Sequence, residues 1–217
     1  MRRNLSILFG IITLFAVVAQ FILMLENRVA SIPETIVRFF SFFTILTNLL
    51  VAIYFTDQSI RKKNHEAGFI NRPGVLTAVT IYIVIVGLVY QVLLRHIWQP
   101  TGLQKIVDEL LHSVIPLLVI LYWYLFEKKS EVQYGQIFRW LIYPLAYLLY
   151  ILARGTISGF YPYPFVDVRN LGLQSVLVNS GVLLVFFAAF SLLLIRIGKG
   201  VNKKNRNLKN QTASAEK

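Results

Sequence analysis

The chain has 217 residues, of which 56% are hydrophobic and only 15% are charged, with 22 lysines and arginines against 10 acidic residues. Soluble domains carry about 25% charged residues, so this composition excludes an ordinary water-soluble domain and indicates a protein of the lipid bilayer. The sequence contains no cysteine, which excludes disulfides and thiolate metal sites.

Six apolar segments are long enough to cross the hydrocarbon core as helices, which takes about 20 residues and at least about 17. The fifth segment is the weakest, because it carries Arg139 near its start and Pro144 inside. A strand-built pore would show short alternating segments instead. The sequence therefore predicts an all-α polytopic membrane protein, one bundle of six transmembrane helices within residues 1–197, with spans at about 5–25, 36–54, 75–94, 106–126, 137–153 and 173–195.

The first segment allows two interpretations. Arg2 and Arg3 precede an apolar stretch in which Val17 and Ala19 have the spacing of a signal-peptide cleavage site. The apolar run continues through residues 21–25 without a break, as a retained membrane span does. We expect a retained span, and the sequence leaves cleavage open.

The distribution of the basic residues predicts the topology. The net charge of +12 has the sign expected of a nucleic-acid-binding protein, but its pattern is that of a membrane protein. Positive residues concentrate in cytoplasmic loops, so we expect a multi-pass protein of a cell membrane with both termini in the cytoplasm and no nucleic-acid partner. The basic tail, residues 198–217, is expected to be disordered. The predicted outer side then holds only Arg28, Arg38, Arg95, Lys105, Arg154 and Arg169.

Two predicted external segments are rich in aromatic residues and proline. One connects the third and fourth spans over residues 96–102, and the other follows the fifth span over residues 155–167. Aromatic residues at this depth can form an interfacial belt. Alternating prolines also stiffen the backbone, so the second segment could instead be a rigid lid over a cavity. The sequence does not separate these two interpretations.

An ionisable residue lies inside the fourth span. His112 stands about two turns into the segment, and Asp108 precedes it by one helical turn, so both are expected on one helix face. A histidine within a membrane span is by default a functional hypothesis, although a neutral histidine can also hold helices together. Asp108 is either placed to orient the imidazole or is the polar start of the helix.

The second span carries Thr44 and Asn48, which are four residues apart and share a helix face. The second and fourth spans both enter from the predicted outer side. A rise of ~1.5 Å per residue places Thr44 about 12 Å deep and His112 about 9 Å deep, which is a similar level. Threonine and asparagine in membrane helices also serve as packing residues, and this interpretation stays open for both.

These positions suggest a threonine–histidine pair. A threonine hydroxyl becomes a nucleophile when a neighbouring base accepts its proton, and neutral imidazole is such a base. Asp108 would fix the tautomer and stabilise the imidazolium. Arg154, at the external end of the fifth span, would hold a carboxylate or an oxyanion, or its side chain extends to the headgroups. A site at this depth would act on lipids and fatty-acyl chains.

Five short motifs occur in a characteristic order. They are Phe-Phe-Thr-Ile-Leu-Thr-Asn at 42–48, Trp-Gln-Pro-Thr-Gly at 98–102, Leu-Leu-His-Ser-Val-Ile-Pro at 110–116, Tyr-Pro-Leu-Ala-Tyr at 143–147 and Tyr-Pro-Phe at 163–165. Over roughly residues 5–197 the chain resembles the androgen-induced-protein family of small multispan membrane proteins. The second and fourth motifs resemble its bacterial branch, which implies a bacterial plasma membrane.

The resemblance implies an activity and two site residues. Animal members of the family are atypical threonine hydrolases that cleave fatty acid esters of hydroxy fatty acids and depend on one intramembrane Thr and one His. These match Thr44 and His112 here, with Thr47 as the alternative register for the threonine. The residues around them differ from the animal pattern, so the natural substrate is not implied. The expected partners are membrane lipids and fatty-acyl substrates, without cofactor or metal, and no oligomeric state is indicated.

Two other functions remain as alternatives. A small membrane transporter or lipid-binding bundle would line a polar cavity with His112 and its neighbours, but the sequence lacks the internal repeats typical of such transporters. Haem ligation by His96 and His112 is less favoured, because His96 falls at a loop boundary. We therefore expect an intramembrane lipid-ester hydrolase, with catalytic residues Thr44 and His112 and supporting residues Asp108, Asn48 and Arg154.

Overall fold

The computed structural model describes residues 1–61 and 68–215, with side chains up to Val201. Over these ranges the regular elements are helices, and none is a strand. Lys62 and Lys63, between the second and third predicted spans, lie outside the described residues. The prediction of an all-α fold is confirmed for the described residues, among which six helices are long and apolar enough to cross a membrane: Arg2–Glu26, Phe43–Ile60, Val75–Leu94, Gly102–Phe126, Tyr134–Ser158 and Val168–Val201.

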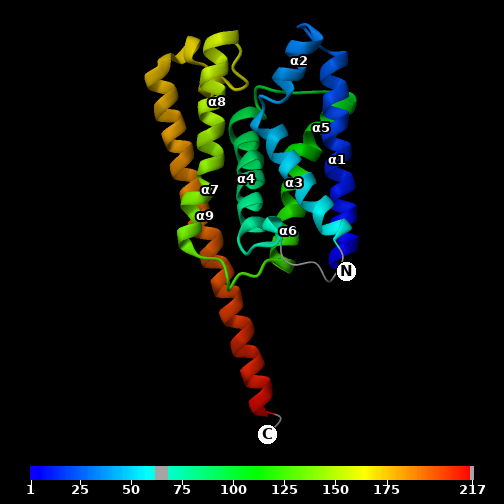
Figure 1. Ribbon diagram of the computed structural model, residues 1–217, viewed down its shortest axis with the longest axis vertical. Coiled ribbons are helices and arrows are strands. Elements are labelled where there is room, and N and C mark those ends of the chain that lie inside the picture. The colour runs from blue at the N-terminus through cyan, green and yellow to red at the C-terminus, as the bar shows by residue number, and fades with distance from the viewer. Residues whose placement is uncertain (62–67, 216–217) are drawn as a thin grey trace.

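Helix α4 (Val75–Val89) lies at the centre of the bundle, as Figure 1 shows. Its residues from Leu76 to Gly87 are buried, because it is apolar on all its faces. α1 (Arg2–Glu26) and α3 (Phe43–Ile60) pack along each other on one side of α4. α8 (Ile142–Ser158) and α9 (Val168–Ala215) form a pair on the other side.

The two ends of the bundle differ in what they contain. The upper end in Figure 1 carries the short helix α2 (Ile32–Phe39) and residues 159–167. The lower end carries Met1, and α9 extends beyond it, so both chain termini lie toward this end.

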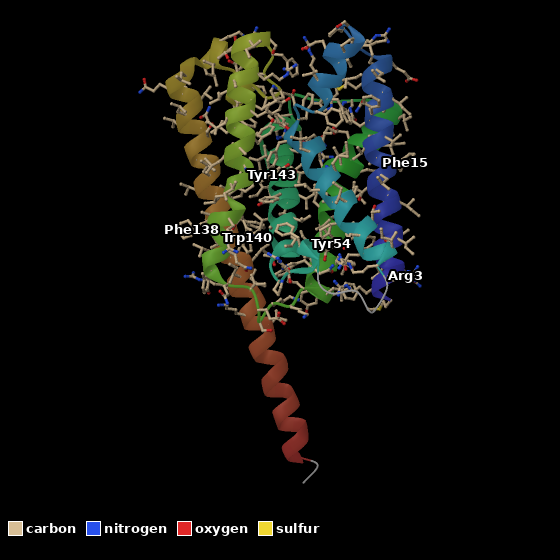
Figure 2. The ribbon with its side chains drawn as sticks, viewed as in Figure 1. Arg3, Phe15, Tyr54, Phe138, Trp140 and Tyr143 are labelled. Atoms are coloured by element: carbon tan, nitrogen blue, oxygen red, sulfur yellow. The ribbon has the colours of Figure 1, made fainter. Side chains whose placement is uncertain are left out.

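The outer surface of the bundle is apolar. Figure 2 shows Phe15 and Phe138 pointing away from the bundle, and their exposed fractions are 54% and 79%. Tyr143 points inward instead, and its hydroxyl lies 3.1 Å from the hydroxyl of Thr47 on α3. Soluble monomers rarely expose large contiguous apolar patches, so this surface suits contact with lipid.

The predicted second span is divided into two helices, α2 and α3. Thr44 therefore lies in the first turn of α3 and not about eight residues into a continuous helix. Between the two helices, the hydroxyl of Ser41 donates to the carbonyl of Val37 at 2.7 Å. The hydroxyl of Tyr147 donates to the carbonyl of Ser41 at 2.8 Å. These side-chain bonds take the place of backbone bonds and end α2.

The fifth span, the weakest by sequence, consists of α7 (Ile137–Trp140) and α8, after a short 3₁₀ turn η4 (Tyr134–Gln136). Pro144 has no N–H, so the carbonyl of Trp140 lacks its helical donor. The hydroxyl of Tyr82 on α4 donates to that carbonyl at 2.7 Å. The proline break therefore ties this span to the central helix.

The tail also differs from its prediction. The sequence predicts disorder from Gly198, whereas α9 continues as a helix to Ala215. Extending an existing helix avoids the cost of nucleating a new one, and no proline interrupts the tail.

Candidate active site

The fourth span changes its helical winding where it carries His112. It consists of α5 (Gly102–Glu109), a π turn η3 (Leu110–Val114) and α6 (Ile115–Phe126). Pro116 lacks an N–H, and its ring would clash with the carbonyl of His112 in a regular helix. The chain widens into η3 just before the proline, and π turns of this kind frequently mark functional sites.

The neighbouring third span has the same feature at the same end. It continues from α4 into a π turn η2 (Tyr90–Leu94). Gly87 of α4 packs against η3, because a Cβ at this position would lie 2.9 Å from the carbonyl oxygen of His112. The missing side chain lets the two spans approach closely, which brings Tyr90 beside His112.

The imidazole of His112 is held from two sides. Its Nδ1 lies 2.9 Å from the backbone carbonyl of Asp108 and 3.3 Å from the carboxylate Oδ1 of the same residue. The ring of Tyr90 stacks on it with centroids 4.1 Å apart, and the hydroxyl of Tyr90 donates to Asp108 Oδ2. Both neighbours of Nδ1 are acceptors, so Nδ1 carries the proton and Nε2 is left as an acceptor.

Thr44 faces this free nitrogen. Its Oγ1 lies 3.3 Å from His112 Nε2, within reach for the hydroxyl to donate to the imidazole. Its backbone N–H donates to the hydroxyl of Tyr163 at 3.3 Å, and Oγ1 lies 3.4 Å from the same hydroxyl. The structure therefore brings together the predicted pair, Thr44 and His112, with Asp108 behind the histidine.

These polar groups line a cavity of about 460 Å³ at the upper end of the bundle. Thr44 and His112 face the same cavity, together with Asp108, Tyr90 and Tyr163. Most of the remaining wall is apolar and comes from α1, α2, η2 and the connection after it. Its members include Leu23, Met24, Phe39, Leu94, Ile97 and Trp98. A concave, mostly apolar cavity with a few convergent polar groups is the usual form of a ligand site.

A second, smaller cavity of about 90 Å³ adjoins Thr44 and Tyr163. Thr44 and Tyr163 belong to the walls of both cavities. Most of the rest of its lining comes from α4, α8 and α9 and is almost wholly apolar, with Val86, Leu148, Leu184 and Phe187 among its members.

Asn48 and Thr47, one turn further along α3, do not line either cavity. The amide of Asn48 donates to the carbonyl of Thr44 at 2.9 Å and to the carbonyl of Leu111 at 3.5 Å. Asn48 therefore connects the two elements that carry Thr44 and His112. The hydroxyl of Thr47 pairs with Tyr143 and faces α8, away from the histidine.

Arg154 lies apart from the site. It is buried on α8, donates to Glu34 of α2 at 2.9 Å and to the carbonyl of Phe160 at 3.3 Å, and lines neither cavity. Arg154 is thus not placed to bind a substrate carboxylate, because its guanidinium already binds the carboxylate of Glu34. A hydrogen bond from Arg38, and then the charge of Arg154, keep the pKa of Glu34 below its usual value, against an opposing effect of burial.

Three residues at the cavity were not singled out from the sequence. Tyr90 lies near the end of a span, where an aromatic belt is the ordinary interpretation. Tyr163 belongs to the proline-rich segment of residues 155–167, for which the sequence allows a belt or a lid. Arg38 lines the cavity, whereas Arg154 does not. His96, proposed as a haem ligand, is exposed and does not belong to the cavity.

Comparison with models of protein families, with curated proteins and with solved structures gives no match for this chain. The family resemblance of its short motifs therefore stays an expectation.

Proposed function

We propose that this protein is an intramembrane hydrolase of lipid esters, with Thr44 as nucleophile and His112 as general base. The observation that carries the proposal is the 3.3 Å contact between Thr44 Oγ1 and His112 Nε2 in the wall of a largely apolar cavity. Asp108, behind the histidine, supplies the third member of a relay that resembles a hydrolytic triad in its roles.

The first half of the reaction forms an acyl-enzyme. His112 Nε2 takes the proton of the Thr44 hydroxyl while Oγ1 attacks the ester carbonyl carbon. Nδ1–H donates to the backbone carbonyl of Asp108, and the carboxylate of Asp108, 3.3 Å from Nδ1, stabilises the imidazolium. The imidazolium then gives its proton to the ester oxygen as the carbon–oxygen bond breaks. The alcohol leaves, and the acyl group stays on Thr44 Oγ1.

The second half returns the free enzyme. A water molecule gives a proton to His112 Nε2 and attacks the acyl carbon, and the imidazolium then protonates Oγ1 as its bond to the acyl group breaks. The products are a carboxylic acid and the original Thr44 hydroxyl. No cofactor or metal enters either half.

Lipids are the substrate class that the surroundings of the site favour. The wall of the large cavity is mostly apolar, with Arg28 and Arg38 near α2 as its cationic members. An ester carbonyl beside Thr44 would adjoin two cavities, which could take its two substituents, because Thr44 lines both. Together with the predicted topology, in which both termini are cytoplasmic, this arrangement would open the site to the outer half of a bacterial plasma membrane.

The direct test measures ester hydrolysis by the purified protein in detergent, with a panel of long-chain fatty-acid esters. We expect Thr44→Ala and His112→Ala to lower turnover by at least about 10³-fold. Thr47→Ala is the matched control, because it removes a buried hydroxyl from the same helix outside both cavities, and it should keep turnover within about threefold.

A second measurement does not depend on the natural substrate. A fluorophosphonate probe should label the wild-type protein at Thr44, as identified by mass spectrometry of the labelled peptide, and should not label Thr44→Ala. Equal turnover by wild type and both site variants would refute the proposal. Saturable lipid binding without turnover or labelling would instead favour the lipid-binding bundle.

A further inference from the structure

The protons around Thr44 can be assigned one by one. Nδ1 of His112 has only acceptors beside it, so Nε2 accepts, and the hydroxyl proton of Thr44 goes to Nε2. The lone pairs of Thr44 Oγ1 then remain free to accept a hydrogen bond. The hydroxyl of Tyr163 lies 3.4 Å from Oγ1. Because the proton of Thr44 is directed to His112, Tyr163 is the donor in this pair.

The backbone N–H of Thr44 reinforces this direction. Thr44 lies in the first turn of α3, where N–H groups have no partner within the helix. Its N–H donates to the hydroxyl oxygen of Tyr163 at 3.3 Å. A hydroxyl that accepts a hydrogen bond becomes a better donor through its own proton. The N–H, the hydroxyl and Oγ1 therefore form a short chain of polar groups at the positive end of a helix dipole.

The Tyr163 ring is fixed in place by its surroundings. It comes from the segment before the 3₁₀ turn η5 (Pro164–Val166), and it stacks on Phe165 with centroids 5.2 Å apart. It also meets Phe42 edge-on at 5.9 Å. Burial raises the pKa of the Tyr163 hydroxyl above its usual range, so the group keeps its proton. A donor held in this way needs little reorganisation during a reaction.

We propose that the hydroxyl of Tyr163 is the oxyanion donor of this hydrolase and thus a further catalytic residue. The inference rests on the proposed hydrolase function. When Oγ1 attacks, negative charge moves from Oγ1 to the former carbonyl oxygen, which is bonded to the same carbon. A donor that contacts Oγ1 and lines both cavities lies beside that oxygen. Tyr163 keeps its own proton throughout and gives only a hydrogen bond.

Tyr163→Phe removes the hydroxyl and keeps the ring that packs against Phe42 and Phe165. We expect kcat for ester hydrolysis to fall about 10²–10³-fold, the range for loss of one oxyanion donor, with KM changed by less than about threefold. The matched control is Tyr161→Phe, which makes the same change in the same segment at a residue outside both cavities. It should leave kcat within about twofold.

A pair of inhibitors separates an oxyanion donor from a residue that only holds the segment. A long-chain trifluoromethyl ketone adds to a nucleophilic hydroxyl and carries an oxyanion, whereas the product fatty acid does not form such an adduct. Tyr163→Phe should weaken the ketone about 10²-fold and the acid less than threefold. Equal weakening of both inhibitors together with a lowered Tm would overturn the inference.

The outcomes also separate this inference from the proposed function. If Thr44→Ala and His112→Ala abolish turnover while Tyr163→Phe keeps the wild-type kcat and ketone affinity, the oxyanion role is wrong and the hydrolase stands. If Thr44→Ala keeps full turnover, both are wrong. Loss of kcat and ketone affinity in Tyr163→Phe alone among the two tyrosine variants supports the role.

Discussion

The third and fourth spans are joined by polar residues at both ends, and the two junctions differ in kind. At the upper end, Tyr90 of η2 meets Asp108 and His112 of the fourth span. At the lower end, Thr77 of α4 meets Trp123 of α6 and Glu127 just beyond it. The same pair of spans therefore carries two buried polar junctions, one lining a cavity and one outside the two described cavities.

The lower junction is a helix cap supplied by a neighbouring span. Gly74, which precedes α4, has no side chain to cap the helix. The carboxylate of Glu127 instead accepts from the Thr77 N–H at 2.9 Å and from the Thr77 hydroxyl at 2.8 Å. Trp123 Nε1 donates to the same hydroxyl at 3.0 Å. These polar groups pair with one another, so the junction serves to hold two helices together.

At the upper junction, polar groups that can react face a cavity. The junction lies where both spans form π turns, and it presents the Nε2 of His112 and the hydroxyl of Thr44 to a cavity. At the lower junction the helices are regular and the polar groups pair with one another, so these groups hold the two spans together. At the upper junction the helical winding changes and a cavity is present, so similar residue types can take part in a reaction. The predictions below change one junction and leave the other intact.

The largest effect among these changes is expected from Asp108→Asn. The substitution removes the charge that stabilises the imidazolium, but the backbone carbonyl of the same residue still accepts from Nδ1 and keeps the tautomer. We therefore expect kcat to fall about 10²-fold. This loss is smaller than in a hydrolytic triad whose aspartate carboxylate alone fixes the histidine tautomer. The matching change at the lower junction, Glu127→Gln, should leave kcat per folded molecule within about twofold. Equal losses in the two variants would remove the distinction between the junctions.

Gly87→Ala is expected to have the next largest effect. The added Cβ would lie 2.9 Å from the carbonyl oxygen of His112 and 3.3 Å from the ring of Pro116, so η3 must move. A shift of well under 1 Å in the histidine should lower kcat about tenfold, because misplacement near 1 Å costs about 10²-fold. Gly181→Ala on α9 is the control, since its Cβ would meet no atom within 4 Å. Wild-type activity of Gly87→Ala would mean that the position of η3 does not limit catalysis.

Hydropathy was sufficient to predict six apolar helices, since an apolar run of membrane length sets a span. The helix rise indicated only a similar depth for Thr44 and His112, and the resemblance of the short motifs implied their pairing. The division of the second span could not be predicted in this way. It depends on the hydroxyl of Tyr147, which comes from a distant part of the chain.

The rest of the site depends on tertiary contacts that no local pattern encodes. Tyr163 reaches Thr44 only because residues 159–167 fold back over the upper end. As a cation near a span end, Arg154 is expected from the sequence either to hold a substrate group or to extend to the headgroups. Its actual partner, Glu34, is 120 residues away in sequence. Such pairings are fixed by packing, so residue type alone could not separate Arg154 from Arg38.

A change at the lower junction should affect stability and not activity. In Glu127→Ala, the N–H and the hydroxyl of Thr77 both lose their acceptor, which costs about 1–3 kcal/mol of unfolding free energy. The Tm of the purified protein should fall, while kcat at a temperature well below Tm stays within about twofold of wild type. Glu131→Ala, which removes a half-exposed carboxylate in the same loop, should leave Tm almost unchanged. A tenfold loss of kcat in Glu127→Ala would link the lower junction to the site.

The smallest effect is expected for Glu34. It lies at the upper end, but like the lower junction it should affect stability and not activity. Its pKa is lowered in the folded protein by the hydrogen bond from Arg38 and then by Arg154. A carboxyl with a lowered folded pKa adds stability above its ordinary value of 4.5, and that contribution is lost as pH falls below this value toward the folded pKa. The effect is below about 1 kcal/mol, because the side chain of Glu34 is partly exposed.

Thermal unfolding between about pH 3 and pH 7 measures this contribution. Glu34→Gln should have a slightly lower Tm than wild type at pH 7 and should converge with it in acid, where wild type loses its ionised partner for Arg154. Glu26→Gln, which removes an exposed carboxylate on α1, is the control for the loss of one charge and should keep the Tm of wild type at pH 7. At pH 7, kcat should be the same in all three proteins, because neither carboxylate lines the cavity. If Glu34→Gln instead lowers kcat without lowering Tm, the Glu34–Arg154 pair acts on the substrate and belongs with the upper junction.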